Sequence, residues 1–156
     1  MAEKTNAMRK LAAMKIAFTE HYYADTGAIA GADVARALCE DAARVFKTLV
    51  TVGKTGAHYV FLVPVEEELD LKKAAASVGE KSVEMIKSKE LLPLTGYIHG
   101  GCSPIGMKKF FPTAIHSTAA DFETILFSAG KIGYQVEIPL SSLQKAIRIS
   151  VCDLIV

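Results

Sequence analysis

The sequence predicts an α+β fold, formed by a single domain of residues 1–156 around a mixed β-sheet. Three observations lead to this prediction. The chain has 156 residues, which is close to the size of one domain. Hydrophobic residues make up 51% of the chain, enough to build a core without disulfides or metals. Helical patterns and hairpin-like strands are intermixed rather than strictly alternating, which favours α+β over a doubly wound parallel sheet.

The first half of the chain combines short helices with apolar strands. Thr5 precedes an amphipathic segment and is well placed to cap its helix. Two β-branched segments flank the turn sequence Gly53-Lys54-Thr55-Gly56, which predicts a hairpin. The expected elements are a helix over 5–14, a strand over 16–23, a helix over 32–44, and strands over 45–52 and 58–65.

The second half begins with a helix that Asp70 caps and Gly79 ends. Pro93 is expected to stop a short helix soon after it starts, because proline cannot continue the hydrogen-bond pattern. The remaining elements are expected as a strand over 81–85, a helix over 88–92, an irregular segment over 95–106, strands over 110–116, 124–128 and 133–138, a helix over 141–147 and a strand over 149–156.

Composition excludes several classes of protein. Lys and Arg number 18 against 17 Asp and Glu, and this net charge of +1 argues against a protein that coats nucleic acid. No apolar run reaches the length of a membrane span, and no signal peptide is expected. The three cysteines form no CxxC pair, so neither a disulfide framework nor a zinc site is predicted. We therefore expect a cytoplasmic protein without metal or cofactor.

Lys47 is the first candidate functional residue. Alternate residues of a strand share a face, so Lys47 lies between Val45 and Leu49 on one face of the 45–52 strand. A lysine in this position either extends its charge to solvent at a sheet edge or lines an apolar pocket. In a pocket, its ammonium group would bind an anion or a developing oxyanion.

The glycine-rich segment over residues 95–106 is the second candidate. Its adjacent Gly100 and Gly101 allow backbone N–H groups to converge on one point, which suits a carbonyl or phosphate oxygen. A structural loop between strands explains the same composition. Cys102 follows His99 by three residues, which raises a cysteine nucleophile as a further alternative.

Taken together and in this order, several segments resemble the YbaK/EbsC family, free-standing relatives of the editing domain inserted in bacterial prolyl-tRNA synthetase. The resemblance covers nearly the whole chain. The segments are Val45-Phe46-Lys47-Thr48-Leu49, Val63-Pro64-Val65, Leu69-Asp70-Leu71-Lys72-Lys73, Thr95-Gly96-Tyr97, Gly100-Gly101-Cys102-Ser103-Pro104-Ile105-Gly106 with Lys108 and Lys109, and Ser128-Ala129-Gly130-Lys131. The resemblance implies a largely antiparallel, barrel-like sheet flanked by helices.

The resemblance also implies roles for individual residues. Lys47 matches an essential strand lysine, Tyr23 a pocket tyrosine, and Gly100 with Gly101 the loop that binds the aminoacyl carbonyl. Where the family often has an aspartate, this chain has a glutamine, which keeps hydrogen bonding and loses a charge. The substrate-binding set is completed by Thr48, Ser103 and this glutamine, Gln135; Lys108 and Lys109 are candidates for contacts with tRNA phosphates.

The function implied is hydrolysis of mischarged Cys-tRNA(Pro), and of Cys-tRNA(Cys), with tRNA as substrate and prolyl-tRNA synthetase as a partner. An aminoacyl ester is already activated, so positioning and oxyanion stabilisation suffice without a protein nucleophile. Three alternatives stay open: a tRNA- or synthetase-binding module without catalysis, an Ala-tRNA(Pro) deacylase, and a hydrolase with Cys102 as nucleophile.

Overall fold

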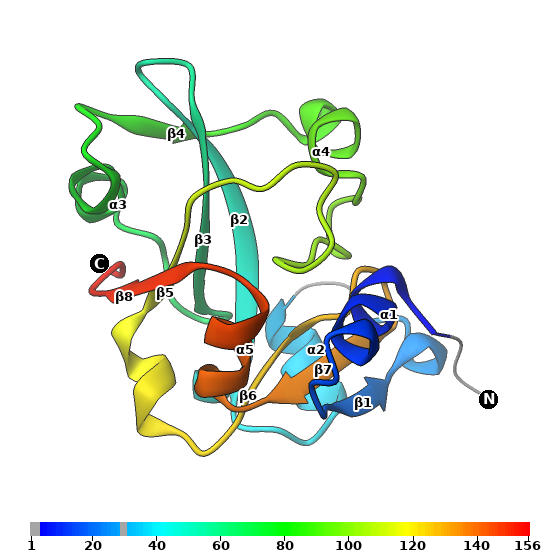
Figure 1. The fold of residues 1–156 in the computed structure, drawn as a ribbon. Helices are drawn as coiled ribbons and strands as arrows, with labels where there is room; N and C mark the ends of the chain where they lie inside the picture. Colours follow the sequence, from blue (N-terminus) through cyan, green and yellow to red (C-terminus); the bar gives the residue numbers. More distant parts are fainter. Residues whose placement is uncertain (1–3, 29–30) are drawn as a thin grey trace.

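Two β-sheets and five α-helices make up the fold in the computed structural model, which describes residues 4–28 and 31–156 (Figure 1). The larger sheet has five strands in the order β4-β2-β3-β5-β8, and the smaller has three in the order β1-β7-β6. The strands are β1 Thr19–Tyr22, β2 Phe46–Gly53, β3 His58–Pro64, β4 Val83–Met85, β5 Thr113–His116, β6 Ile125–Ser128, β7 Tyr134–Ile138 and β8 Ile149–Cys152.

The larger sheet is mixed, as the sequence predicts. Strand β2 pairs antiparallel with both β3 and β4, whereas β5 pairs parallel with β3 and with β8. The smaller sheet is entirely antiparallel. A bridge between Val45 and Leu126 joins the two sheets at the start of β2, so the strands curve around a shared interior. The predicted α+β class is therefore confirmed.

Helices cover the outside of these sheets (Figure 1). Helix α3 lies on one side of the β2–β3 hairpin and α4 on the other. No helix in the described part of the chain is long and apolar enough to cross a membrane. The helices are α1 Asn6–Ala13, α2 Gly31–Ala37, α3 Leu71–Val78, α4 Ser88–Thr95 and α5 Leu140–Ala146, with 3-10 turns η1 Ala24–Thr26, η2 Ala42–Arg44 and η3 Ser117–Asp121.

Three predicted helix ends are confirmed by their hydrogen bonds. The Thr5 side chain accepts from the Met8 amide and caps α1. The Asp70 carboxylate accepts from two amides of the first turn of α3, and Gly79 ends that helix in the left-handed conformation. Local polar side chains and glycine thus determine these ends, which is why the sequence alone locates them.

Two predicted helices have other lengths. The helix expected over 32–44 ends at Ala37, because Cys39 adopts a left-handed φ of 57° and the following amide, of Glu40, bonds back to the Ala35 carbonyl. The helix expected to stop near Pro93 instead continues to Thr95 and includes the proline. A proline this close to the end of an eight-residue helix removes a single backbone hydrogen bond.

Three predicted strands are at least three residues shorter than expected. The strand expected over 16–23 is β1, the strand expected over 110–116 begins only at Thr113, and the strand expected over 149–156 ends at Cys152. Pro112 directly precedes β5 and has no N–H group to donate to the sheet. The hairpin strands β2 and β3 agree with the prediction to within one residue at either end.

The main core fills the space between the two sheets. Phe46, Leu62 and Ile115 from the larger sheet pack in one cluster with Phe127 and Val136 from the smaller sheet, and each is almost fully buried. A second cluster lies under α3, on the opposite face of β3. Strand β3 is therefore buried on both faces, and β2 is held rigidly between its neighbours. A functional group carried by β2 has a fixed position.

Candidate active site

A cavity of about 450 Å³ opens beside β2, where the two sheets meet. Its walls come from β2 and the residue before it, the residues that follow β1 and β3, helix α2, the end of β6, the start of β7, the segment from the end of β4 into α4, and the glycine-rich loop. The residues that line it are Tyr23, Val34, Val45, Phe46, Lys47, Thr48, Leu49, Val50, Val65, Met85, Ile86, Lys87, Ser88, Leu91, His99, Gly100, Cys102, Ser128 and Gln135. This volume suits a small ligand rather than a large one.

Lys47 lies in the wall of this cavity, on strand β2 opposite Val63 of β3. Its side chain is half-buried, and within the described residues it has no ion pair with a carboxylate. A partly desolvated ammonium group without a counter-charge attracts anions and developing negative charge. The structure therefore places the lysine where the sequence analysis expected a pocket-lining ammonium group.

Three buried polar atoms of the cavity wall have no hydrogen-bond partner among the residues that the structure describes. They are the Tyr23 hydroxyl, the Thr48 hydroxyl and the Gln135 side-chain oxygen. Buried polar groups in native proteins are nearly always hydrogen-bonded, because leaving one unpaired costs about 1–3 kcal/mol. Three such atoms around one cavity indicate that a polar ligand completes them.

Backbone pairing explains how these side chains meet. Gln135 of β7 lies between His21 of β1 and Ser128 of β6, which brings Ser128 to the same cavity. The Tyr23 amide, just beyond β1, donates to the Gly133 carbonyl at 2.7 Å. The small sheet thus sets the positions of both Tyr23 and Gln135, while the large sheet sets those of Lys47 and Thr48.

The glycine-rich loop contributes one amide rather than two. Gly100 lines the cavity with a left-handed φ of 86°, and its N–H has no hydrogen-bond partner in the described part of the chain. The Gly101 amide already donates to the Ile98 carbonyl at 2.9 Å, closing a turn. A side chain on Gly101 would also press on the Ile132 backbone. Gly101 therefore shapes the loop. From the sequence we expected its N–H to bind a substrate carbonyl, but the turn to Ile98 already uses this N–H.

Three other predicted residues lie outside the cavity wall. Ser103 is fully buried, and its hydroxyl accepts from the Ile105 amide two residues on, so it stiffens the loop instead of reaching a substrate. Lys108 and Lys109 are both exposed, and neither lines the cavity. The Lys108 amide donates to the Thr95 carbonyl, which fixes this segment against the end of α4.

Cys102 and His99 both line the cavity, but they do not form a nucleophile pair. The Cys102 side chain is buried, and burial raises the pKa of its thiol to about 12. At neutral pH the group is therefore a neutral thiol rather than a thiolate. No hydrogen bond joins it to His99 in the described part of the chain, so the imidazole does not activate it.

In an assay of the aminoacyl-tRNA deacylation that the family resemblance implies, we expect the Cys102→Ala and Cys102→Ser variants to react within about threefold of the unchanged protein, because a protonated thiol is a poor nucleophile. The measurement is a steady-state deacylation assay beside a thermal unfolding curve. The curve separates loss of activity from the modest destabilisation expected when a hydroxyl is buried there. A loss of a hundredfold or more in a folded variant would contradict this assignment.

One wall of the cavity is not predicted by any feature of the sequence. Ile86, Lys87, Ser88 and Leu91 reach it because the three-residue strand β4 pairs with the end of β2, with Met85 opposite Thr51. This wall joins segments that are more than thirty residues apart in the chain. Neither periodicity nor a motif marks such a contact, so no local signal was available to find it.

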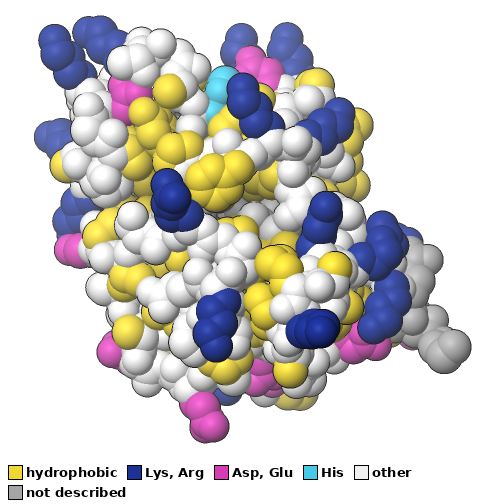
Figure 2. Space-filling view, viewed as in Figure 1, with side chains coloured by type: hydrophobic (Ala, Val, Ile, Leu, Met, Phe, Trp, Pro, Cys, Tyr) yellow, Lys and Arg dark blue, Asp and Glu magenta, His cyan; other side chains and the backbone are white. Residues whose placement is uncertain are grey.

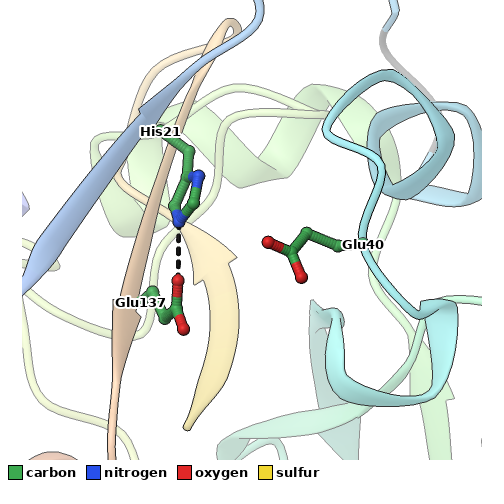
Figure 3. A group of neighbouring side chains, drawn as sticks. All are labelled: His21, Glu40 and Glu137. Carbon is green, nitrogen blue, oxygen red and sulfur yellow. Dashed lines mark hydrogen bonds and ion pairs between the residues drawn. The ribbon is translucent and has the colours of Figure 1, made fainter.

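A separate polar cluster lies outside the cavity, where β1 and β7 face the segment before β2. Figure 3 shows His21 bonded to Glu137, with the Glu40 carboxylate pointing toward them; the ligand atoms of these residues lie within 4.8 Å of one another. The Arg44 guanidinium contacts both carboxylates. Burial alone would raise the pKa of Glu137, but Thr124, His21 and Arg44 together hold it below its ordinary value. A cation would have to displace Arg44, so the cluster fits an ion-pair network between the sheets better than a metal centre.

The fold forms a cavity that presents an ammonium, an amide N–H and several neutral hydrogen-bonding side chains, a set of groups suited to a small polar ligand. Comparison with known proteins makes the class of protein specific. The chain belongs to the aminoacyl-tRNA editing domain family, whose model matches residues 27–146. It is thus an aminoacyl-tRNA deacylase that removes amino acids from tRNA by ester hydrolysis.

A curated relative and two solved structures resemble the chain closely. The relative is EbsC of Enterococcus faecalis, provisionally named a Cys-tRNA(Pro)/Cys-tRNA(Cys) deacylase; it is 46% identical over 137 residues, 87% of this chain and 84% of EbsC. The crystal structure of the hypothetical protein APE2540 has a TM-score of 0.88 at 18% identity, covering 97% of this chain and 99% of the other. The crystal structure of a protein provisionally described as a trans-editing enzyme for prolyl-tRNA synthetase has a TM-score of 0.85 at 23% identity, covering 99% of both chains. These structures establish the fold.

Proposed function

We propose that this protein removes cysteine from mischarged Cys-tRNA(Pro), and from Cys-tRNA(Cys), as the name of its relative EbsC also suggests. The observation that carries the proposal is the set of unpartnered polar atoms of Tyr23, Thr48 and Gln135 around the Lys47 ammonium. A cysteinyl ester offers an ammonium group, a carbonyl and a thiol to these groups. The cavity of about 450 Å³ accommodates this aminoacyl group together with part of the terminal adenosine.

The proposed chemistry needs no nucleophile from the protein. The thiolate of the substrate cysteine attacks its own ester carbonyl, a carbon–sulfur bond forms, and the bond to the ribose oxygen breaks. That oxygen leaves with a proton, and water then hydrolyses the cyclic thioester to free cysteine. The Gly100 N–H and the Lys47 ammonium are the groups that stabilise negative charge during the attack, and the cavity holds sulfur and carbonyl in reacting geometry.

The need for such an enzyme follows from the limits of size discrimination. Cysteine and proline are similar in volume, and one small apolar difference changes binding by only about 1–3 kcal/mol. A synthetase pocket built for proline therefore admits some cysteine, and a second site must remove it. We propose that the protein works in the cytoplasm beside prolyl-tRNA synthetase, because a net charge of +1 gives little general attraction to tRNA.

The test of the proposed function is a panel of Cys-, Ala- and Pro-tRNA(Pro) incubated with the purified protein, with and without prolyl-tRNA synthetase. We expect release of cysteine well above release of alanine or proline. Preferred release of alanine would instead identify an Ala-tRNA(Pro) deacylase. If no amino acid is released under any condition, the protein is a binding module without catalysis and the proposal fails.

Changing Gln135 to aspartate is expected to lower the ratio of Cys-tRNA to Ala-tRNA deacylation by about tenfold. A carboxylate at this buried position opposes formation of the negatively charged substrate sulfur, which alanine does not need. The matched control is Gln135→Asn, which has the length of aspartate and no charge. If the aspartate variant deacylates each of the three aminoacyl-tRNAs at the same rate as the unchanged protein, Gln135 has no role in selectivity.

A further inference from the structure

A band of exposed hydrophobic and basic side chains borders the cavity. Its hydrophobic members are Leu92, Ile98 and Phe110, each more than half exposed. Its basic members are exposed as well. We call this surface the rim and define it as Leu92, Ile98 and Phe110 together with Lys87, Lys89, Lys108 and Lys109. In Figure 2, the region where Figure 1 places α4 and the chain leading to β5 shows hydrophobic side chains open to solvent among Lys and Arg side chains.

The two segments that carry the rim are held against each other. The Lys108 amide donates to the Thr95 carbonyl at 2.9 Å, and the Lys108 side chain lies over Gly96, so closely that a Cβ there would lie 3.2 Å from it. The end of α4 and the segment before β5 therefore form one continuous surface. Exposed side chains from both segments lie on it together, although they are ten or more residues apart in sequence.

The rim also continues directly into the cavity. Leu91 lines the cavity and Leu92 is the next residue; His99 and Gly100 line it and Ile98 immediately precedes them. A ligand whose end enters the cavity from this side therefore passes across the rim. In the proposed function, that ligand is the 3′ end of a tRNA, which is single-stranded and presents unstacked bases.

Phe110 lies on the surface, whereas the residue after it belongs to the core. The neighbouring Phe111 is 7% exposed and packs edge-on against the His58 ring, with centroids 5.7 Å apart. Phe110 is 54% exposed, and its aromatic ring is available on the surface. An exposed aromatic ring on a surface that carries lysines is the arrangement by which proteins bind unpaired nucleotides, with bases stacked on the ring and phosphates paired with lysines.

Charge favours the same ligand. Residues 87–110 contain four lysines and one acidic residue, Glu90, which gives this segment a charge of +3. The whole chain carries +1, so all other residues together carry −2. None of the four lysines has an ion pair within the described residues. This segment of a nearly neutral protein therefore carries a net positive charge, whereas the remaining residues taken together do not.

We propose that the rim binds the unpaired 3′-terminal nucleotides of the tRNA, with one base stacked on Phe110 and the phosphates paired with Lys108 and Lys109. This inference rests on the proposed function, since it names the surface that guides the substrate into that same cavity. Such a surface explains how a protein with a net charge of +1 binds an RNA end. The protein binds a short single-stranded segment through base stacking and a few local charges.

The test measures binding of an RNA hairpin that carries no amino acid and consists of the tRNA acceptor stem with its unpaired 3′ nucleotides. The comparison RNA is the same stem without the unpaired nucleotides (the blunt stem). We expect preference for the unpaired end, and Phe110→Ala to weaken its binding about 5- to 140-fold with little effect on the blunt stem. Lys108→Ala should reduce the slope of log affinity against log salt by about 0.7. The matched controls are Leu71→Ala and Lys72→Ala, on the opposite side of the β2–β3 hairpin. They should leave the RNA affinity and the salt slope unchanged.

Several results would overturn the inference: equal binding of both RNAs, unchanged binding in Phe110→Ala, or a loss that affects the blunt stem equally. Rim variants that lose contact with prolyl-tRNA synthetase but keep full RNA affinity would also overturn it, by assigning the rim to a protein partner. Deacylation measured on the same preparations separates the two proposals. Rim-dependent RNA binding without release of any amino acid refutes the deacylase proposal alone, whereas full Cys-tRNA(Pro) turnover in Phe110→Ala refutes the rim alone.

Discussion

Replacing Lys47 by alanine is expected to slow Cys-tRNA(Pro) deacylation on the order of 100-fold without loss of the fold. The ammonium group is half-buried in the cavity wall and has no carboxylate partner within the described residues, so its charge is available to the substrate. A charge-assisted hydrogen bond of this kind contributes about 1.5–3 kcal/mol, and loss of correct positioning adds to the effect. The measurement is single-turnover deacylation of Cys-tRNA(Pro).

Stability measurements distinguish this role from a structural one. Since Lys47 makes no ion pair in the described part of the chain, its removal should leave the free energy of unfolding unchanged within about 0.5 kcal/mol. The control variant is Lys54→Ala, which removes an exposed lysine from the turn after the same strand and should keep full activity. Near-normal deacylation by a folded Lys47→Ala protein would refute the assigned role.

The location of Lys47 was predictable because strand periodicity is a local property. Residues 45–52 are β-branched and apolar with one lysine, and the structure forms β2 over almost the same residues. Caps at Thr5 and Asp70 were predictable for the same reason, since a capping side chain bonds to amides within its own first turn. The hairpin between β2 and β3 also depends on neighbouring residues alone.

Features that depend on distant pairing were not predictable. The parallel pairing of β5 with β3 and β8 and the division into two sheets need contacts between distant segments. The amide of Gly101 illustrates the same limit within the site: its sequence suits carbonyl binding, yet the turn to Ile98 uses its N–H. Likewise, α4 continues past Pro93 to Thr95, where the Thr95 hydroxyl donates to the Leu91 carbonyl and the Gly96 amide donates to the Leu92 carbonyl.

Replacing Gly133 by alanine is expected to lower the free energy of unfolding by about 2–6 kcal/mol. Its φ of 102° is strained for any residue with a side chain, and the added Cβ would lie 2.6 Å from the Ala24 Cβ and 3.0 Å from the Ala24 Cα. Backbone strain costs about 1–3 kcal/mol and overpacking a similar amount. Urea unfolding monitored by circular dichroism gives the difference.

The matched control for this variant is Gly56→Ala. Gly56 has a similar φ of 90°, but no atom lies within 4 Å of the added Cβ, so this substitution introduces backbone strain without a clash. The difference between the two variants isolates the contact with Ala24, and Ala24→Gly should recover part of the loss in Gly133→Ala. Because the Gly133 carbonyl accepts from the Tyr23 amide, deacylation should also fall more in Gly133→Ala than in Gly56→Ala. Equal unfolding energies and equal rates in the two variants would show that the Gly133 turn neither packs tightly against Ala24 nor positions Tyr23.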